Sequence, residues 1–223
     1  MIDLPGGVLA VVSHPDDETF GCGGTLALHA SMGADVRVLC LSCNPPERRR
    51  EILGAAEELG VPEPVVLDDL AIAQTPGLIR RVADQVVAAK PRVVLTHVPF
   101  DYHREHRAAY EVVKEAVEWA AHTTTYDEPC QVERLLLMEV NTLIPSPHVL
   151  VDVSEHMEAK RRATKRYASQ LAKFTWGYYE RFNEKKAELR GVQGGCAYAE
   201  AFQEEPLAGN GPFYPVRSAR SLL

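Results

Sequence analysis

The chain has no apolar run that comes near the roughly 18 residues needed to span a membrane. Its first residues, Met1 to Pro5, lack the cationic stretch with which a signal peptide begins. Basic residues are not in excess either, because 24 Lys and Arg against 31 Asp and Glu give a formal net charge of −7. Surfaces that bind nucleic acids or acidic membranes normally show a basic excess. We therefore expect a soluble, cytoplasmic protein whose partner is neither a nucleic acid nor a membrane.

Cysteine is too sparse and too scattered for a disulfide-stapled secreted protein. The five cysteines are dispersed and odd in number, unlike the dense sets of small secreted domains. Cys40 and Cys43 form a C-x-x-C pair, but no second pair completes a four-cysteine zinc site. Reduced, buried thiols are the favoured interpretation, and a redox or structural metal role is the alternative.

Repeats, low-complexity tracts and Pro/Ser-rich linkers are also missing, so we expect one domain over residues 1–223. Short β-branched runs alternate with longer amphipathic segments, which is typical of a mostly parallel sheet covered by helices on both faces. The predicted fold is a Rossmann-like, doubly wound α/β sandwich. The expected strands are 8–13, 36–42, 65–67, 93–96, 135–140 and 148–153, and the expected helices are 23–31, 46–59, 76–89, 106–121, 154–171 and 179–189.

Residues 192–223 differ in composition from the rest of the chain. They are rich in Gly and Pro, which predicts an ordered loop region that wraps around the domain or packs on another subunit. An aromatic group lies just before them and consists of Trp176, Tyr178, Tyr179 and Phe182. Aromatics at this spacing are more often core or subunit interface than a surface that stacks on a sugar ring.

The segment His14-Pro15-Asp16-Asp17-Glu18 directly follows the first expected strand. A histidine beside adjacent carboxylates offers two ligands to a divalent metal and a free base next to them. Open α/β sheets bind their ligands at the carboxyl ends of strands, so this is the expected place of an active site. The alternative is a solvated turn, since Asp also caps helices well.

A second polar segment, residues 97–106, follows the expected strand 93–96 and contains His103 and His106. In a parallel sheet both loops leave at the same edge, so His14 and Asp17 could meet a histidine of the second loop around one metal. Two ligands from the first loop and one from the second leave a fourth position for water, as in catalytic zinc sites. The pairing of the loops favours a metal site over two unrelated turns.

These motifs resemble those of the LmbE/PIG-L-type zinc N-deacetylases, which remove acetyl groups from N-acetylglucosamine units of conjugates. The resemblance rests on the first motif followed by Gly23-Gly24-Thr25, and on His103-x-x-His106 with Arg107-Ala108. Arg48-x-x-Glu51 and Tyr198 to Phe202 are similar to further segments of the family. The resemblance spans most of the chain and implies a zinc hydrolase on a Rossmann-like fold.

The resemblance also implies roles for individual residues. His14, Asp17 and His106 would bind zinc, and iron(II) or another divalent ion is an alternative because this ligand set is not exclusive to zinc. Asp16 would be the general base that activates water and could later deliver the proton to the leaving amine. His103 would polarise the reacting amide or donate a proton to it.

One position departs from the family pattern. The family usually has His-Pro-Asp-His in the second motif, whereas this chain has His103-Arg104-Glu105-His106. Glu105 is still expected to orient a histidine through its ring N–H, although its longer side chain changes the geometry. We therefore predict a working site that includes Glu105.

Two residues are candidates for substrate binding. Arg48 is one by resemblance, since a guanidinium can hold sugar hydroxyls or a phosphate by paired hydrogen bonds. The run Arg48-Arg49-Arg50 fits a solvated helix face equally well. Asp69, in the pair Asp68-Asp69 after the third expected strand, could contact substrate hydroxyls or merely begin a turn.

The sequence predicts a zinc-dependent hydrolase that removes the acetyl group from a small N-acetylglucosamine-type sugar or glycoconjugate. A homo-oligomer is a further expectation by analogy with relatives. One alternative is an amidase that acts on a glucosaminyl conjugate with a larger acyl group. The other is a non-catalytic sugar- or nucleotide-binding domain that uses Gly21 to Thr25 as its ligand loop. Loss of bound zinc in His106→Ala would separate the enzymes from the binding domain.

Overall fold

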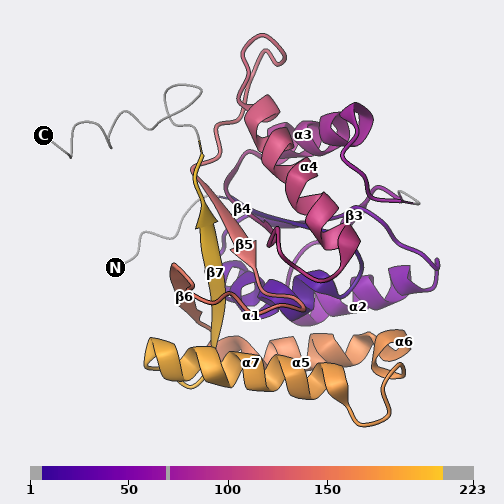
Figure 1. Ribbon diagram of the computed structural model, residues 1–223, viewed down its shortest axis with the longest axis vertical. Coiled ribbons are helices and arrows are strands. Elements are labelled where there is room, and N and C mark those ends of the chain that lie inside the picture. Colours follow the sequence, from indigo (N-terminus) through magenta and orange to yellow (C-terminus); the bar gives the residue numbers. More distant parts are fainter. Residues whose placement is uncertain (1–6, 69–70, 208–223) are drawn as a thin grey trace, which may run out of the picture.

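Short apolar runs form a mixed, mostly parallel sheet in the computed structural model, which describes residues 7–68 and 71–207. All six expected strands are present, and the sheet has seven strands in the order β3-β2-β1-β4-β5-β7-β6. Helices flank it on both faces (Figure 1), so the predicted fold class is confirmed. The strands are β1 (Gly7–Val12), β2 (Val36–Cys40), β3 (Val65–Val66), β4 (Pro91–His97), β5 (Arg134–Met138), β6 (Val149–Asp152) and β7 (Ala199–Glu205).

The helices bury their apolar sides in two separate cores, one on each face of the sheet. Helices α3 and α4 cover one face, and α1, α2 and α5 cover the other, while α7 packs against β6 and β7. None of the helices in the described ranges is long and apolar enough to cross a bilayer. The helices are α1 (Asp17–Ser31), α2 (Arg48–Leu59), α3 (Pro76–Ala89), α4 (Arg104–Ala120), α5 (Met157–Arg166), α6 (Ala168–Leu171) and α7 (Tyr178–Gly194), with a short 3-10 turn at Ser154–His156.

The strand order reverses at the centre of the sheet. From β1 the chain proceeds outward through β2 and β3, and it then returns to place β4 on the other side of β1. β1 pairs in parallel with both β2 and β4, so the loops after β1 and β4 leave the same edge next to each other. Such a reversal opens a crevice at the carboxyl ends of the strands. Both polar motifs begin there.

Most of the described part of the Gly/Pro-rich C-terminal region is regular structure, contrary to the predicted loop. Residues 192–194 complete α7, and β7 is inserted between β5 and β6, antiparallel to both. Its first four residues, from Ala199 to Phe202, are buried, and ladder bonds on both sides hold the strand. The weak apolar alternation of Ala-Glu-Ala-Phe concealed this strand because one of its buried residues is a glutamate. Residues 208–223 lie outside the described part.

Glu200 is buried because it completes a break in helix α1. The helix begins at Asp17 rather than at the expected Gly23, but its backbone leaves helical geometry at Cys22 (φ −144°). The break frees backbone N–H groups, and the Glu200 carboxylate accepts those of Gly24 and Thr25 at 2.9 and 2.7 Å. The predicted start therefore marks the second half of a kinked helix.

We expect Glu200→Ala to lower the free energy of unfolding by about 3–5 kcal/mol, as removal of one partner of a buried ion pair does. Lys160 Nζ lies 2.6 Å from Glu200 Oε1, and both side chains are almost fully buried. The substitution leaves a buried ammonium without its carboxylate, with only the Phe20 carbonyl as acceptor, and removes the acceptor of two backbone N–H groups. Urea denaturation measures the loss, and the exposed Glu63→Ala should change stability by under about 0.5 kcal/mol. An equally small effect for Glu200→Ala would contradict this account of the kink.

Candidate metal and catalytic site

The loop after β1 holds Asp16 in a backbone conformation that L-residues rarely adopt (φ 119°). Hydrogen bonds within the loop stabilise it: the Asp16 N–H donates to Glu18 Oε2 at 3.1 Å, and the His14 N–H donates to Asp17 Oδ2 at 2.8 Å. Such a conformation costs about 1–3 kcal/mol and persists only where the surroundings impose it. The loop is thus built to present these side chains, beyond what a simple helix cap requires.

Arg48 fixes the Asp16 carboxylate from the side of α2. Its Nη2 lies 3.0 Å from Asp16 Oδ2 and also donates to the Pro15 carbonyl. Both side chains are buried. Burial raises the pKa of Asp16 well above its usual range and the Asp17 charge adds to this, while the Arg48 guanidinium opposes it. Asp16 is therefore a carboxylate with unusually high proton affinity, held in one orientation.

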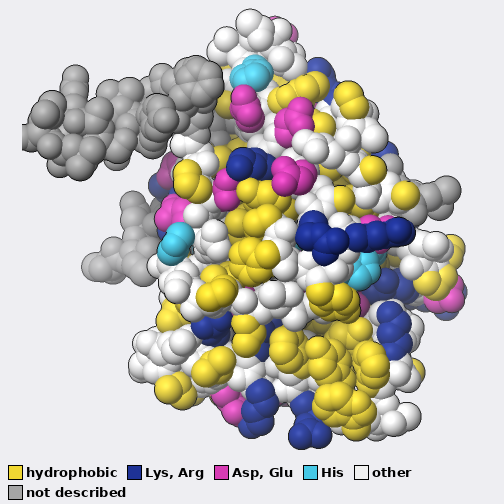
Figure 2. Space-filling model, in the orientation of Figure 1, with side chains coloured by type: hydrophobic (Ala, Val, Ile, Leu, Met, Phe, Trp, Pro, Cys, Tyr) yellow, Lys and Arg dark blue, Asp and Glu magenta, His cyan; other side chains and the backbone are white. Residues whose placement is uncertain are grey.

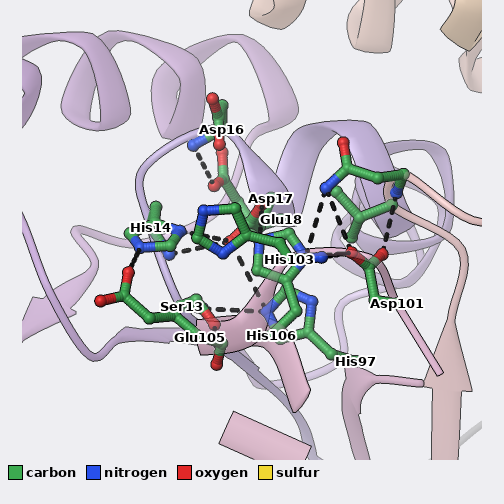
Figure 3. A network of polar contacts seen from close by, with 12 residues as sticks. Ser13, His14, Asp16, Asp17, Glu18, His97, Asp101, His103, Glu105 and His106 are labelled. Atoms are coloured by element: carbon green, nitrogen blue, oxygen red, sulfur yellow. Dashed lines mark hydrogen bonds and ion pairs between the residues drawn. The ribbon is translucent and has the colours of Figure 1, made fainter. Parts of the chain in front are cut away.

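The three residues expected to bind a metal converge at the sheet edge (Figure 3). Asp17 lies between two histidines, with His106 Nε2 at 3.2 Å from Oδ1 and His14 Nδ1 at 3.5 Å from Oδ2. The ring centroids of His14 and His106 are 5.6 Å apart. Residues far apart in the chain are thus brought together, as the paired loops predicted.

The electrostatics of this cluster suit a cation. Burial alone would lower the pKa of His106, but the Asp17 and Asp101 carboxylates raise it to about 10. Burial alone would likewise raise the pKa of Asp17, but His106 and His97 hold it well below its usual range. The carboxylates thus favour positive charge at this place, whether as a proton on His106 or as a metal cation that replaces this proton. Two overlapping groups have donor atoms close enough to hold one ion, His14 with His103 and His106, and Asp17 with His97 and His106.

His103 lies at the start of α4, beside the cluster. Its ring centroid is 5.1 Å from that of His14 and 4.7 Å from that of His106. Burial lowers the pKa of His103, and the neighbouring His106 and His14 lower it further. Its buried Nδ1 finds no hydrogen-bond partner in the described ranges. The His103 ring therefore lies beside the candidate metal ligands His14 and His106, but unlike them it is not paired with a carboxylate of the described part of the chain.

Glu105 contacts His14. Its Oε2 lies 2.7 Å from His14 Nε2. The side chain is about one-fifth exposed and reaches across from α4 to the loop after β1. A carboxylate on one ring nitrogen orients the ring and leaves the other nitrogen, here Nδ1 beside Asp17, free to bind. The histidine that Glu105 was expected to orient is His14.

A cavity of about 330 Å³ opens over these residues. It brings together six of the eight predicted site residues, while Glu105 stands behind His14. Asp69 lies outside the described residues, and its neighbour Asp68 is exposed and pairs with Arg49 at 3.2 Å. The lining consists of His14, Asp16, Asp17, Phe20, Asn44, Arg48, Tyr102, His103, His106, Val140, Asn141, Gln170, Lys173 and Tyr179.

Residues 9–117, which include both loops, match the family described as PIG-L: GlcNAc-PI de-N-acetylase. This stretch of the chain is a PIG-L (LmbE-like) family domain. A curated relative, diacetylchitobiose deacetylase of Thermococcus kodakarensis, is 27% identical, with 89% of this chain and 83% of the relative covered. Another, a probable N-acetyl-alpha-D-glucosaminyl L-malate deacetylase of Bacillus anthracis, is 29% identical, with 74% and 81% covered. The solved structure of the conserved protein TT1542 from Thermus thermophilus is 28% identical (TM-score 0.82; 94% of this chain and 99% of that chain covered).

The family motifs did not reveal two buried supports of the PIG-L site. Asp101 Oδ1 lies 3.3 Å from His106 Nδ1, and its carboxylate accepts the backbone N–H groups of His103 and Asn141. His97 accepts the Ser13 N–H through Nε2 at 3.0 Å and stacks on His106 at 4.1 Å between centroids. The signal for Asp101 was available, since a metal-binding histidine almost always has a carboxylate or carbonyl on its other nitrogen.

We expect Asp101→Asn to weaken zinc binding by about 10- to 100-fold, the usual effect of removing such a support. Asn retains an oxygen near His106 Nδ1 but not the negative charge. Titration with a competing chelator measures the affinity. The exposed Asp127→Asn is the matched control and should leave affinity unchanged. Equal affinities for both variants would show that Asp101 serves the fold of the loop rather than the metal.

Proposed function

We propose that this chain is a zinc-dependent hydrolase that removes the N-acetyl group from an N-acetylglucosamine-type sugar or glycoconjugate. The observation that carries the proposal is the convergence of His14, Asp17 and His106 beside the buried carboxylate of Asp16 in one cavity. The curated relatives described above, named as deacetylases of glucosaminyl compounds, support the same reaction. The compounds named for these relatives are small, which supports a small-molecule substrate here.

His14, Asp17 and His106 would hold the metal. A divalent zinc ion there would supply a Lewis acid and lower the pKa of bound water to about 7. Glu105 and Asp101 fix the two imidazole rings from behind, so the ligands need little rearrangement to bind. Iron(II) fits the same donor set, and loading the protein with either ion compares them.

Asp16 is the proposed general base. Arg48 holds its Oδ2, so the carboxylate cannot turn away from the cavity. Asp16 accepts a proton from the attacking water, and the water oxygen bonds to the carbonyl carbon of the acetyl group. As the C–N bond breaks, Asp16 returns the proton to the leaving amine, and acetate and the free amino sugar result. The raised pKa of Asp16 favours its part as a proton carrier in both directions.

His103 is the proposed partner of the amide oxygen. Negative charge develops on that oxygen during attack, and a donor already in place stabilises it without reorganisation. His103 lines the cavity next to both metal-binding histidines. This position supports the proposed hydrogen bond from His103 to the oxyanion.

Acetate release tests the function. Protein loaded with zinc is expected to release acetate from N-acetylglucosamine conjugates, and the sugar product should gain a free amine. Faster release of a longer acyl group from matched N-acyl substrates would indicate the amidase alternative. Saturable binding of the sugars without release, after loading with zinc or iron(II), would refute the hydrolase and leave a binding domain.

We expect Glu105→Gln to reduce zinc affinity and kcat/KM by about tenfold, the lower end of the usual effect of such a change. Gln cannot balance charge on His14, and its amide can turn a donor toward Nε2. Glu105→Asp, which restores the usual family residue, should lose less. If zinc affinity, turnover and the pH profile of Glu105→Gln matched wild type, the orienting role of Glu105 would be wrong.

A further inference from the structure

Two large aromatic side chains lie exposed between α6 and α7, and a third stands at the start of α7. Phe174 is 43% exposed and Trp176 is 58% exposed, and Tyr178 is partly exposed beside them. Tyr178 lies 5.3 Å from the rings of both neighbours, measured between centroids. Figure 2 shows hydrophobic side chains gathered over the part of the molecule where α6 leads into α7. We call Phe174, Trp176 and Tyr178 the aromatic surface.

The aromatic surface continues directly from the catalytic cavity. Tyr179 lines the cavity and stacks on Phe20, with centroids 5.4 Å apart and an interplanar angle of 23°. Tyr179 also contacts two residues of the aromatic surface, Phe174 at 5.7 Å and Tyr178 at 5.1 Å between ring centroids. Lys173, the residue before Phe174, also lines the cavity. A ligand that leaves the cavity on this side therefore meets the aromatic rings next.

A further aromatic residue borders the same opening. Tyr102 lines the cavity from the loop after β4 and is 70% exposed. It lies in a segment far in sequence from the aromatic surface, and its backbone N–H donates to Thr142 Oγ1 at 3.3 Å. The opening thus has aromatic side chains from two separate segments. Large exposed aromatics gathered at one place mark a binding surface more often than an inert one.

We propose that the aromatic surface binds the part of the substrate that projects from the cavity, and that this part carries a ring with a flat apolar face, either a second pyranose or an aryl group. The inference rests on the proposed deacetylase function. Tyr and Trp provide large contact areas at low conformational-entropy cost, and their rings pack on the faces of other rings. A second copy of the chain on this surface would cover the opening, because the cavity-lining Lys173 and Tyr179 directly adjoin the aromatic surface.

Kinetics on matched substrates test the proposal. N-acetylglucosamine is compared with N,N'-diacetylchitobiose and with an aryl N-acetylglucosaminide. Phe174→Ala and Trp176→Ala are expected to raise KM for a ring-bearing substrate by about five- to tenfold, the loss of one aromatic contact. The kcat values and the kcat/KM for the monosaccharide should stay within about twofold. The substrate with the larger increase in KM, chitobiose or the aryl glycoside, shows whether the aromatic surface binds a pyranose or an aryl ring.

The control is Val192→Ala, because Val192 is apolar and 81% exposed but lies near the other end of α7. It should change no kinetic constant. Equal KM increases for the monosaccharide and the ring-bearing substrates would overturn the proposal and indicate a structural effect. Unchanged KM values, together with a smaller particle mass of Trp176→Ala in light scattering, would overturn it in favour of an interface between copies.

Fluorescence separates a failure of this inference from a failure of the proposed function. The chain has two tryptophans, so Trp119→Phe leaves Trp176 as the only indole. Titration of this variant with the ring-bearing glycosides is expected to give a saturable change in emission, with or without turnover, and a weaker change with the monosaccharide. No saturable change with either glycoside would overturn the aromatic surface, even if acetate is released. Binding without release would overturn only the hydrolase.

Discussion

Asp16→Asn is expected to lower kcat by about 10³-fold, within the range that general acid–base catalysis usually contributes. The amide keeps the size of the carboxylate and an oxygen for Arg48 Nη2, so the loop after β1 should remain in place. What is lost is the group that accepts the proton of water and returns it to the amine. KM and zinc content should stay near wild-type values because Asp16 is not among the proposed ligands. Acetate release under saturating substrate measures the change.

Two comparisons make the Asp16 result decisive. Asp127→Asn introduces the same chemical change at an exposed site and should leave kcat unchanged. Zinc content, determined on the same samples, shows whether the metal site is intact. A large loss of zinc from Asp16→Asn would mean that Asp16 is a ligand or supports one. A kcat within tenfold of wild type would remove Asp16 from the role of base.

His106→Ala is expected to abolish metal binding, from about one zinc per chain to almost none, and acetate release should fall to background. His106 is the proposed ligand from the second loop, and its Nε2 lies 3.2 Å from Asp17 Oδ1. Catalytic zinc sites have three protein ligands, so loss of one leaves a pair that binds weakly. Elemental mass spectrometry on protein loaded with zinc and then dialysed measures the content. No zinc in wild type after such loading would refute the hydrolase proposal.

His122→Ala is the matched control, because His122 is an exposed histidine that follows α4. It should keep one zinc per chain. Two other donor groups also lie within reach of one ion: His14 with His103 and His106, and Asp17 with His97 and His106. His97 is the weaker candidate because its Nε2 already accepts the Ser13 N–H at 3.0 Å. Retention of zinc in His14→Ala, with loss in His97→Ala, would reverse this assignment.

Much of the architecture was predictable because helices and strands leave local patterns in a sequence. The expected strands 8–13 and 93–96 correspond to β1 and β4, and the expected helix 76–89 coincides with α3. Its Thr75 cap, whose Oγ1 accepts the Leu78 N–H at 3.3 Å, is the kind of signal that neighbouring residues alone supply. The family resemblance, which rests on contiguous motifs, was recoverable for the same reason.

The meeting of the two loops also followed from the sequence, with one general rule added. His14 and Asp17 follow one parallel strand and His106 follows another, and the carboxyl ends of parallel strands share an edge. The sequence could not show that β1 and β4 are neighbours, but the reversal of strand order between them is a recurrent feature of this fold class. Only the tertiary structure shows which of these side chains lie within hydrogen-bonding distance of one another.

By itself the sequence determined the α/β class, the two polar motifs and their family, because each depends on residues close together in the chain. Only the tertiary structure decided that Glu200 on β7 completes the kink of α1, that Asp101 contacts His106 and that Glu105 contacts His14. Nor could composition show that Tyr179 of α7 lines the cavity and contacts Phe174. The physical reason is that the packing of whole helices and strands decides which side chains meet. A glutamate in a strand, or an acid near a histidine in the chain, has the same neighbours in sequence whether or not the fold brings it a partner. The local sequence therefore cannot reveal the contact.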